Sequence, residues 1–152
     1  MTTLALDLGT ATGFAWRADN SGTLVSGTWS LKPGKYDGGG IRYVRFAGHL
    51  NELHHFARIT HVVYEAVRRH IGTDAAHVYG GLMGTLQAWC EQHAIPYEGV
   101  PVGTIKKFWT GKGNASKTEM IAKAFELGYA PVDDNQADAI ALLCLKCPEN
   151  PS

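Results

Sequence analysis

Several features are scarce or missing in this sequence, and each absence excludes a class of protein. Its 152 residues include only 3 cysteines, an odd number that argues against a disulfide framework and for a reducing, cytoplasmic environment. No apolar run approaches the ~18–20 residues of a membrane span, and Asp7 interrupts the apolar stretch near the N-terminus, so we expect no signal peptide. Charged residues make up 18%, too few for a coiled coil or a disordered chain, while 45% hydrophobic residues can form an ordinary core. We therefore expect one folded domain over residues 1–152, without a membrane partner.

The order of the periodic segments indicates an α/β domain. Three segments rich in apolar, aromatic or β-branched residues are joined by short polar turns, which predicts three antiparallel strands. After the glycine-rich loop at 33–40, apolar residues recur every three or four positions, and helices then alternate with strands. The expected elements are strands at 3–8, 12–16, 23–31, 61–66 and 95–102, and helices at 41–56, 79–89, 116–128 and 135–146. Such an order implies a mixed sheet with helices on both faces.

Four carboxylates lie in surroundings that make them candidates for a metal site at one edge of this sheet. Asp7 lies in the first expected strand and Glu65 near the end of the fourth. Asp134 and Asp138 are four residues apart and share one face of the last helix, although an acid at a helix start, such as Asp134, is commonly a cap. A carboxylate in an apolar segment needs a partner that offsets its desolvation, and no Lys or Arg closely flanks Asp7. Oxygen ligands without a His or Cys pattern favour Mg²⁺ or Mn²⁺ over zinc.

The segments that carry these acids are distinctive in sequence. Residues 4–13 read LALDLGTATG, residues 62–65 read VVYE, and residues 134–139 read DNQADA. In this order and at this spacing they resemble the opening strand, the catalytic-Glu strand and the C-terminal helix motif of the RuvC family of Holliday-junction resolvases, within the RNase H-like nuclease superfamily. The resemblance covers nearly the whole chain, which is as short as the compact members encoded by phages and prophages. It implies an RNase H-like fold and a crossover junction endodeoxyribonuclease.

The resemblance also implies which residues form the active site and what they bind. Asp7, Glu65 and Asp138 match the catalytic metal ligands of the family, with Asp134 or Asn135 completing the site at its rim. Asn135 stands where the family often has an acid or a histidine; its carbonyl oxygen can still bind Mg²⁺, but it cannot act as a base. The family implies two Mg²⁺ ions per active site, replaceable by Mn²⁺, and no organic cofactor. Two such ions ~4 Å apart would activate water and stabilise the leaving oxygen of a phosphodiester.

Two basic stretches without acids are candidate DNA contacts. Arg68 and Arg69 come shortly after Glu65, where they could grip the phosphates around a scissile bond. The second stretch, between residues 100 and 118, contains Lys106, Lys107, Lys112 and Lys117. A solvated surface is the ordinary explanation for such residues. The resemblance, however, implies that Lys106 and Lys117 are DNA-contacting lysines.

From these features we expect a metal-dependent, structure-specific endonuclease that cleaves branched DNA, above all four-way junctions, in recombination, repair or phage DNA processing. The resemblance implies a homodimer in the cytoplasm of a bacterial or phage-infected cell. Two alternatives stay open: an RNase H-like nuclease for structured RNA or RNA–DNA hybrids, and a non-catalytic junction-binding protein. A sugar-kinase or actin-type phosphotransferase also opens with the DLGT sequence, but it needs two such domains, more than 152 residues supply.

The charge balance is informative only once the metal site is considered. The chain has 14 basic and 14 acidic residues, and a formal charge of zero argues at face value against a nucleic-acid partner. If the four candidate acids bind cations, ten acidic residues remain against 14 basic ones. Zero net charge then argues only against strong non-specific binding to duplex DNA.

Overall fold

The strands form a mixed sheet in which the two strands that carry Asp7 and Glu65 are neighbours. The computed structural model describes residues 1–19, 22–68 and 72–148. Its five strands are β1 (Thr2–Asp7), β2 (Ala11–Ala18), β3 (Leu24–Ser30), β4 (His61–Ala66) and β5 (Tyr97–Pro101). They lie in the order β3-β2-β1-β4-β5. The pairs β1–β2 and β2–β3 are antiparallel, whereas the pairs β1–β4 and β4–β5 are parallel. The carboxyl ends of β1 and β4 therefore meet at one edge of the sheet.

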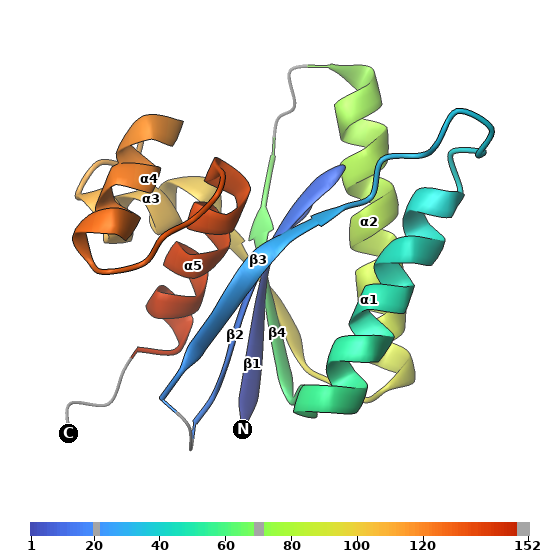
Figure 1. Ribbon diagram of the computed structural model, residues 1–152, viewed down its shortest axis with the longest axis horizontal. Coiled ribbons are helices and arrows are strands. Elements are labelled where there is room, and N and C mark those ends of the chain that lie inside the picture. Colours follow the sequence, from blue (N-terminus) through green and yellow to red (C-terminus); the bar gives the residue numbers. More distant parts are fainter. Residues whose placement is uncertain (20–21, 69–71, 149–152) are drawn as a thin grey trace.

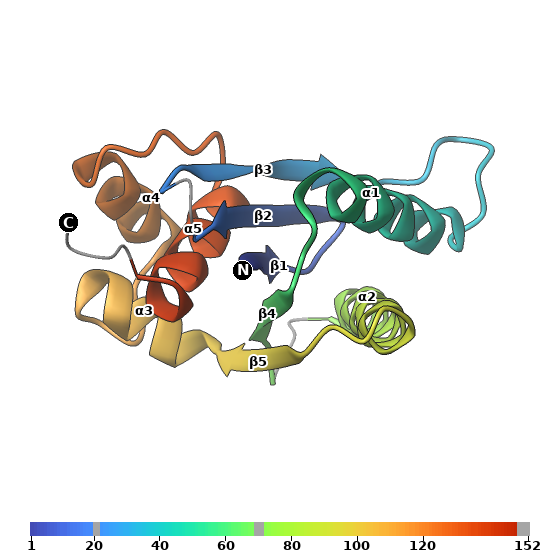
Figure 2. The same ribbon diagram turned by 90° about the horizontal axis from the view of Figure 1, so that it is seen from below.

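Helices cover both faces of the sheet (Figure 1). The five helices are α1 (Ile41–Ala57), α2 (Thr73–Gln92), α3 (Val102–Thr110), α4 (Lys117–Glu126) and α5 (Asp134–Lys146). Viewed from below, α1 and α2 lie on one side of the strands, and α3, α4 and α5 lie on the other (Figure 2). Within the described ranges, no helix combines the length and the apolarity that a membrane crossing requires.

The alternation of side chains along β1 supplies both halves of the core. Leu4 and Leu6 are fully buried in the cluster that joins the sheet to α1 and α2. Ala5 points to the opposite face, in the cluster that includes Ile140 and Leu143 of α5. Complete burial of one such leucine contributes about 1.5–3 kcal/mol. Because Asp7 continues the series of Ala5, its side chain emerges on the α5 face.

The expected fold class is confirmed, but one helix was missed and the bounds of several elements were wrong. The largest difference in bounds is that of α2, which was expected at 79–89 and spans Thr73–Gln92. The strand expected at 95–102 is β5, which begins at Tyr97 and ends at Pro101. Helix α3 was not expected, because two glycines and several β-branched residues lie in its short sequence or beside it. Ile105 and Trp109 are four residues apart and both are buried against the α5 face, so tertiary packing outweighs the weak local preference.

Candidate active site

The register of the parallel strands places Asp7 and Glu65 side by side. Leu6 pairs with Tyr64 across β1 and β4, so the next residue of each strand lies at the same level of the sheet. Asp7 is the last residue of β1, and Glu65 precedes the last residue of β4. Since successive side chains alternate between faces, both carboxylates lie on the face covered by α5.

Helix α5 brings the third carboxylate, and a close contact with β2 sets its position. The backbone of Gly13 lies so near the carbonyl group of Asn135 that a Cβ atom at position 13 would overlap it. A glycine is therefore required where β2 passes under the start of α5. One helical turn after Asp134, Asp138 faces the same edge of the sheet.

Side-chain hydrogen bonds to β3 fix the N-terminus of α5. Asp133 caps the helix: its Oδ1 accepts hydrogen bonds from the Gln136 N–H at 2.8 Å and from the Thr28 hydroxyl at 2.9 Å. Gln136 is buried and donates through Nε2 to the Ser26 hydroxyl at 3.0 Å. The helix cap is thus Asp133 and not Asp134, which instead lines the cleft described below. The sequence predicts a cap at Asp134 or one of its neighbours, because an Asp before a helical segment is a recognisable capping signal. It does not indicate the bonds from Asp133 and Gln136 to β3.

The three carboxylates of Asp7, Glu65 and Asp138 form a compact cluster. One oxygen from each lies within 4.8 Å of the others. Asp7 comes from β1, Glu65 from β4 and Asp138 from α5, so three separate segments of the chain supply the cluster. Glu65 Oε2 and Asp138 Oδ1 are buried and have no hydrogen-bond partner among the described residues. Unpartnered carboxylate oxygens that converge in a buried space suit a hard divalent cation, so the residues present fit Mg²⁺ or Mn²⁺.

The electrostatics of the cluster lead to the same conclusion. Burial, followed by the charges of Glu65 and Asp138, holds the pKa of Asp7 well above its usual range. Burial also raises the pKa of Glu65 above its ordinary value. The pKa of Asp138 rises to about 7, through burial first and then the charges of Glu65 and Asp134. Without a cation the three acids cannot all ionise cheaply, and a bound cation reverses that preference.

Tyr79 of α2 holds the backbone on which Glu65 sits. Its hydroxyl donates a hydrogen bond to the Glu65 carbonyl oxygen at 2.9 Å and accepts one from the Val67 N–H at 3.1 Å. This pair of bonds ties α2 to the end of β4. Tyr79 begins the helix that the sequence predicts at 79–89, and nothing in the sequence indicates where its hydroxyl lies.

The carboxylates lie in a cleft of about 790 Å³ that also contains basic and polar side chains. Besides the three acids, its lining includes Arg68, Lys106, Lys117, Asp134 and Asn135. Lys106 lines the same cleft as the acids, and its charge acts to lower the pKa of both Glu65 and Asp138. Lys117 forms an ion pair with Asp134 at 3.7 Å.

The other candidate DNA contacts lie away from this cleft or cannot be placed. Lys107 and Lys112 are described but do not line the cleft. Both are exposed, and Lys112 pairs with Glu119 at 3.1 Å. Arg69 lies outside the described residues. The cleft therefore gathers three of the five candidate basic residues that the structure describes.

Comparison with known proteins gives similarity of structure without similarity of sequence. No family model and no curated protein sequence matches the chain. Thermus thermophilus RuvC in complex with a Holliday junction substrate has a TM-score of 0.75 at 20% identity, over 93% of this chain and 89% of that one. A second Thermus thermophilus RuvC structure has a TM-score of 0.72 at 20% identity, over 98% of both chains.

A eukaryotic structure is similar as well. The yeast mitochondrial Holliday junction resolvase Ydc2 has a TM-score of 0.63 at 14% identity, over 91% of this chain and 74% of that one. Identities this low establish the architecture alone. The chain therefore has the RNase H-like fold of RuvC, a mixed five-stranded sheet with helices on both faces.

Proposed function

We propose that this chain is a crossover junction endodeoxyribonuclease, a metal-dependent enzyme that cleaves phosphodiester bonds in branched DNA, above all four-way junctions. The observation that carries the proposal is the convergence of Asp7, Glu65 and Asp138 in a cleft with basic side chains. It is supported by the fold shared with a RuvC structure whose bound substrate is a Holliday junction.

The metal ligands in this proposal are Asp7, Glu65 and Asp138, with Asp134 and Asn135 acting from the rim. As the family resemblance implies, Asp7 would help to hold both cations, and Glu65 and Asp138 would each help to hold one of them. Two Mg²⁺ ions, or Mn²⁺ in their place, supply Lewis acidity that activates water and stabilises the leaving oxygen. Tyr79 holds the backbone of Glu65, and the Asp133 cap holds the start of the helix that carries Asp138. These contacts fix the relative positions of the ligands.

The DNA backbone is proposed to enter the cleft along its basic residues. Lys106, Lys117 and Arg68, which all line the cleft, neutralise the phosphates next to the scissile bond. Lys117 would exchange its ion pair with Asp134 for a phosphate oxygen, which frees Asp134 to face the metal site. Lys107, Lys112 and Arg69 are proposed as outer contacts that add affinity without touching the reacting phosphate.

The remaining parts of the proposal concern assembly and setting. Residues 1–152 act as a single nuclease domain, and two copies form a homodimer because a four-way junction presents two strands related by a two-fold axis. The enzyme works in the cytoplasm of a bacterial or phage-infected cell, in recombination, repair or phage DNA processing. Three free cysteines are consistent with a reducing compartment.

A cleavage panel tests this function. Purified protein is incubated with a four-way junction, a flap, a linear duplex, structured RNA and an RNA–DNA hybrid, with Mg²⁺, Mn²⁺ or EDTA. We expect symmetrical nicks in the junction, with 5′-phosphate ends, only when a divalent ion is present. Asp7→Asn should still bind the junction in a gel-shift assay but cut it at least about a hundredfold more slowly.

Other results would redirect the assignment. Preferential cutting of RNA or of the hybrid would make the chain a nuclease of a different class on the same fold. Junction binding without cleavage in any divalent ion would make it a non-catalytic junction-binding protein. Equal cutting of every substrate would remove the specificity for junctions.

A further inference from the structure

An open aromatic groove lies between α1 and the strands β2 and β3, on the face of the sheet opposite the three carboxylates. Its volume is about 350 Å³, and its lining consists of five aromatic side chains, two aliphatic ones and one acid. Strand β3 is the edge strand of the sheet on this side. Two of the lining residues are well exposed, Phe56 at 78% and Val25 at 40%, so the groove is accessible to a partner.

The aromatic rings of the groove are packed against one another in two groups. Trp29 stacks on Phe14 with ring centroids 4.6 Å apart and on His49 with centroids 4.8 Å apart, so this ring is already held by two stacking partners. Trp16 and Phe56 instead meet edge to face, with centroids 6.2 Å apart and planes inclined by 75°. Because Phe56 is exposed, these two rings form a corner whose surfaces a ligand can reach.

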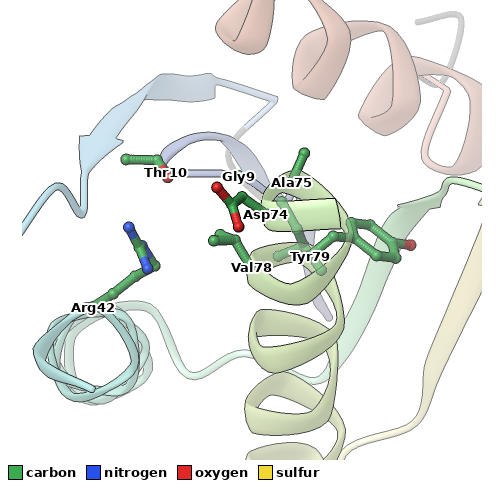
Figure 3. A pocket seen from close by; sticks show the side chains of 8 residues that line it. Gly9, Thr10, Arg42, Asp74, Ala75, Val78 and Tyr79 are labelled. Atoms are coloured by element: carbon green, nitrogen blue, oxygen red, sulfur yellow. The ribbon is translucent and has the colours of Figure 1, made fainter. Parts of the chain in front are cut away.

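The charge of the groove is of one sign. Glu52 contributes a carboxylate to the lining, and no lysine or arginine is part of it. Within the described ranges, no ion pair joins Glu52 to a basic residue. Phe56 lies one helical turn further along α1, so the acid and the exposed ring share a face of the helix. The pocket shown in Figure 3 differs, because Arg42 and Asp74 both line it.

We propose that this groove binds an arginine side chain of a partner protein, with the guanidinium group against Trp16 and Phe56 and paired with the Glu52 carboxylate. The proposal goes beyond the nuclease function and does not depend on it. A guanidinium group is planar and weakly hydrated, stacks on aromatic rings and pairs with carboxylates. The methylene groups of an arginine suit the aliphatic side chains of Val25 and Leu53.

A protein segment fits the groove better than a nucleic acid or a free small cation. A DNA or RNA strand would bring phosphates to the Glu52 carboxylate, which repels them, and the lining offers no lysine or arginine in compensation. A free cation in an open groove would keep much of its contact with water. The surface around an arginine of a partner protein would instead cover the groove and exclude water from the ion pair.

The indole N–H signals of the 4 tryptophans provide the test, because these residues lie in different places. Trp16 and Trp29 line the groove, whereas Trp89 and Trp109 are buried elsewhere and donate hydrogen bonds within the protein. Isotope-labelled protein is titrated by NMR with the peptide acetyl-Thr-Val-Arg-Val-Thr-amide and with its analogue in which neutral citrulline replaces arginine. We expect the Trp16 and Trp29 signals to shift with a dissociation constant on the order of 1 mM for the arginine peptide. The citrulline peptide should bind about tenfold more weakly.

Variants of two exposed groove residues should change this ratio of affinities and leave the fold intact. Glu52→Gln should reduce the preference for arginine over citrulline to about threefold, and Phe56→Ala should reduce it to about twofold. The matched controls are Glu126→Gln and Phe125→Ala, which alter an exposed acid and an exposed ring on α4, on the other side of the sheet (Figure 2). Both controls should keep the wild-type ratio, and the Trp89 signal should stay unchanged in all four variants.

Several results would overturn the proposal. No shift with either peptide, equal binding of the two peptides, or a wild-type ratio in either Glu52→Gln or Phe56→Ala would show that the groove has no site for a cation. Shifts of the Trp16 and Trp29 signals with a single-stranded thymidine oligonucleotide in place of the peptide would make it a nucleic-acid site. Signals that change with protein concentration and not with the peptide would assign the groove to a second copy of the chain. None of these measurements involves cleavage, so their outcome is separate from that of the junction-cleavage panel.

Discussion

The Tyr79 hydroxyl and the Glu65 backbone carbonyl form a hydrogen bond of 2.9 Å that links helix α2 to the strand of a metal-ligand candidate. The same hydroxyl accepts a hydrogen bond from the Val67 N–H. Both bonds lie where β4 ends and the lining of the cleft continues through Val67 and Arg68. A side chain that does not touch the carboxylates therefore controls the direction in which Glu65 leaves the strand.

Tyr79→Phe should lower both the stability and the affinity for divalent ions. The substitution leaves a buried carbonyl and a buried N–H without their shared partner, which costs about 1–3 kcal/mol in the free energy of unfolding. We also expect the Mg²⁺ concentration for half-maximal cleavage to rise about tenfold, because the removal of groups that orient metal ligands generally lowers metal affinity by that factor or more. Denaturant unfolding and a Mg²⁺ titration of the cleavage rate measure the two effects.

Tyr64→Phe provides the matched comparison for this prediction. Tyr64 precedes Glu65, is also buried, and accepts a hydrogen bond from Gln87 Nε2 at 3.0 Å. Its loss should cost a similar amount of stability and leave the Mg²⁺ dependence unchanged. If both variants have the wild-type Mg²⁺ dependence, Tyr79 has only a general structural role.

The acids could be predicted from the sequence because each stands in a local pattern. Asp7 interrupts an apolar strand, and Asp138 lies in an apolar helix. A carboxylate in an apolar segment is costly to bury in any fold, so the sequence alone marks both residues as unusual. The contributions of Tyr79 and Gly13 could not be predicted in this way. Both depend on which distant segment lies against them, and that information belongs to the assembled fold. Helix α3 was missed for the same reason, since it is stabilised by the packing of Ile105 and Trp109.

Asp138→Asn should stabilise the metal-free protein at alkaline pH. Because the pKa of Asp138 is raised from its ordinary 3.8 to about 7, the protonated carboxyl favours the folded state. This contribution is complete below pH 3.8 and is lost as the pH rises through about 7. An amide cannot ionise, so the variant keeps the contribution, and its advantage at pH 8 is on the order of a few kcal/mol.

Thermal unfolding in EDTA between pH 5 and pH 8.5 measures this difference. The melting temperatures of the two proteins should diverge as the pH increases. Saturating Mg²⁺ should remove most of the divergence, because it binds the ionised carboxylates of the wild-type protein. A constant difference in melting temperature across the range would show that Asp138 has no raised pKa.

Gly13→Ala should displace the start of α5 and with it the carboxylate of Asp138. The new methyl group would overlap the Asn135 carbonyl, which is backbone and cannot rotate away. Overpacking of this kind costs about 1–3 kcal/mol of unfolding free energy, and a shift of about 1 Å in a reacting group can slow cleavage about a hundredfold. Gly48→Ala is the control: it lies in α1 with open space around the added methyl group and should stabilise the helix by about 1 kcal/mol. Wild-type stability and cleavage in Gly13→Ala would contradict the close contact between β2 and α5.

A comparison of Lys106→Ala with Lys107→Ala distinguishes the role of a lysine in the cleft from that of an exposed lysine on the same helix, α3. The charge of Lys106 lowers the pKa of Glu65 and Asp138, so its removal should raise both values. Metal binding needs ionised carboxylates, and the acidic limb of the pH–rate profile should therefore move to higher pH in Lys106→Ala. Lys107 is exposed and lies outside the cleft. Lys107→Ala should therefore weaken junction binding and reduce the salt dependence of that binding by about one phosphate contact. The pH dependence of its cleavage rate should be that of the wild-type protein. Identical pH profiles for the two variants would mean that Lys106 contributes to DNA affinity alone and does not act on the carboxylates.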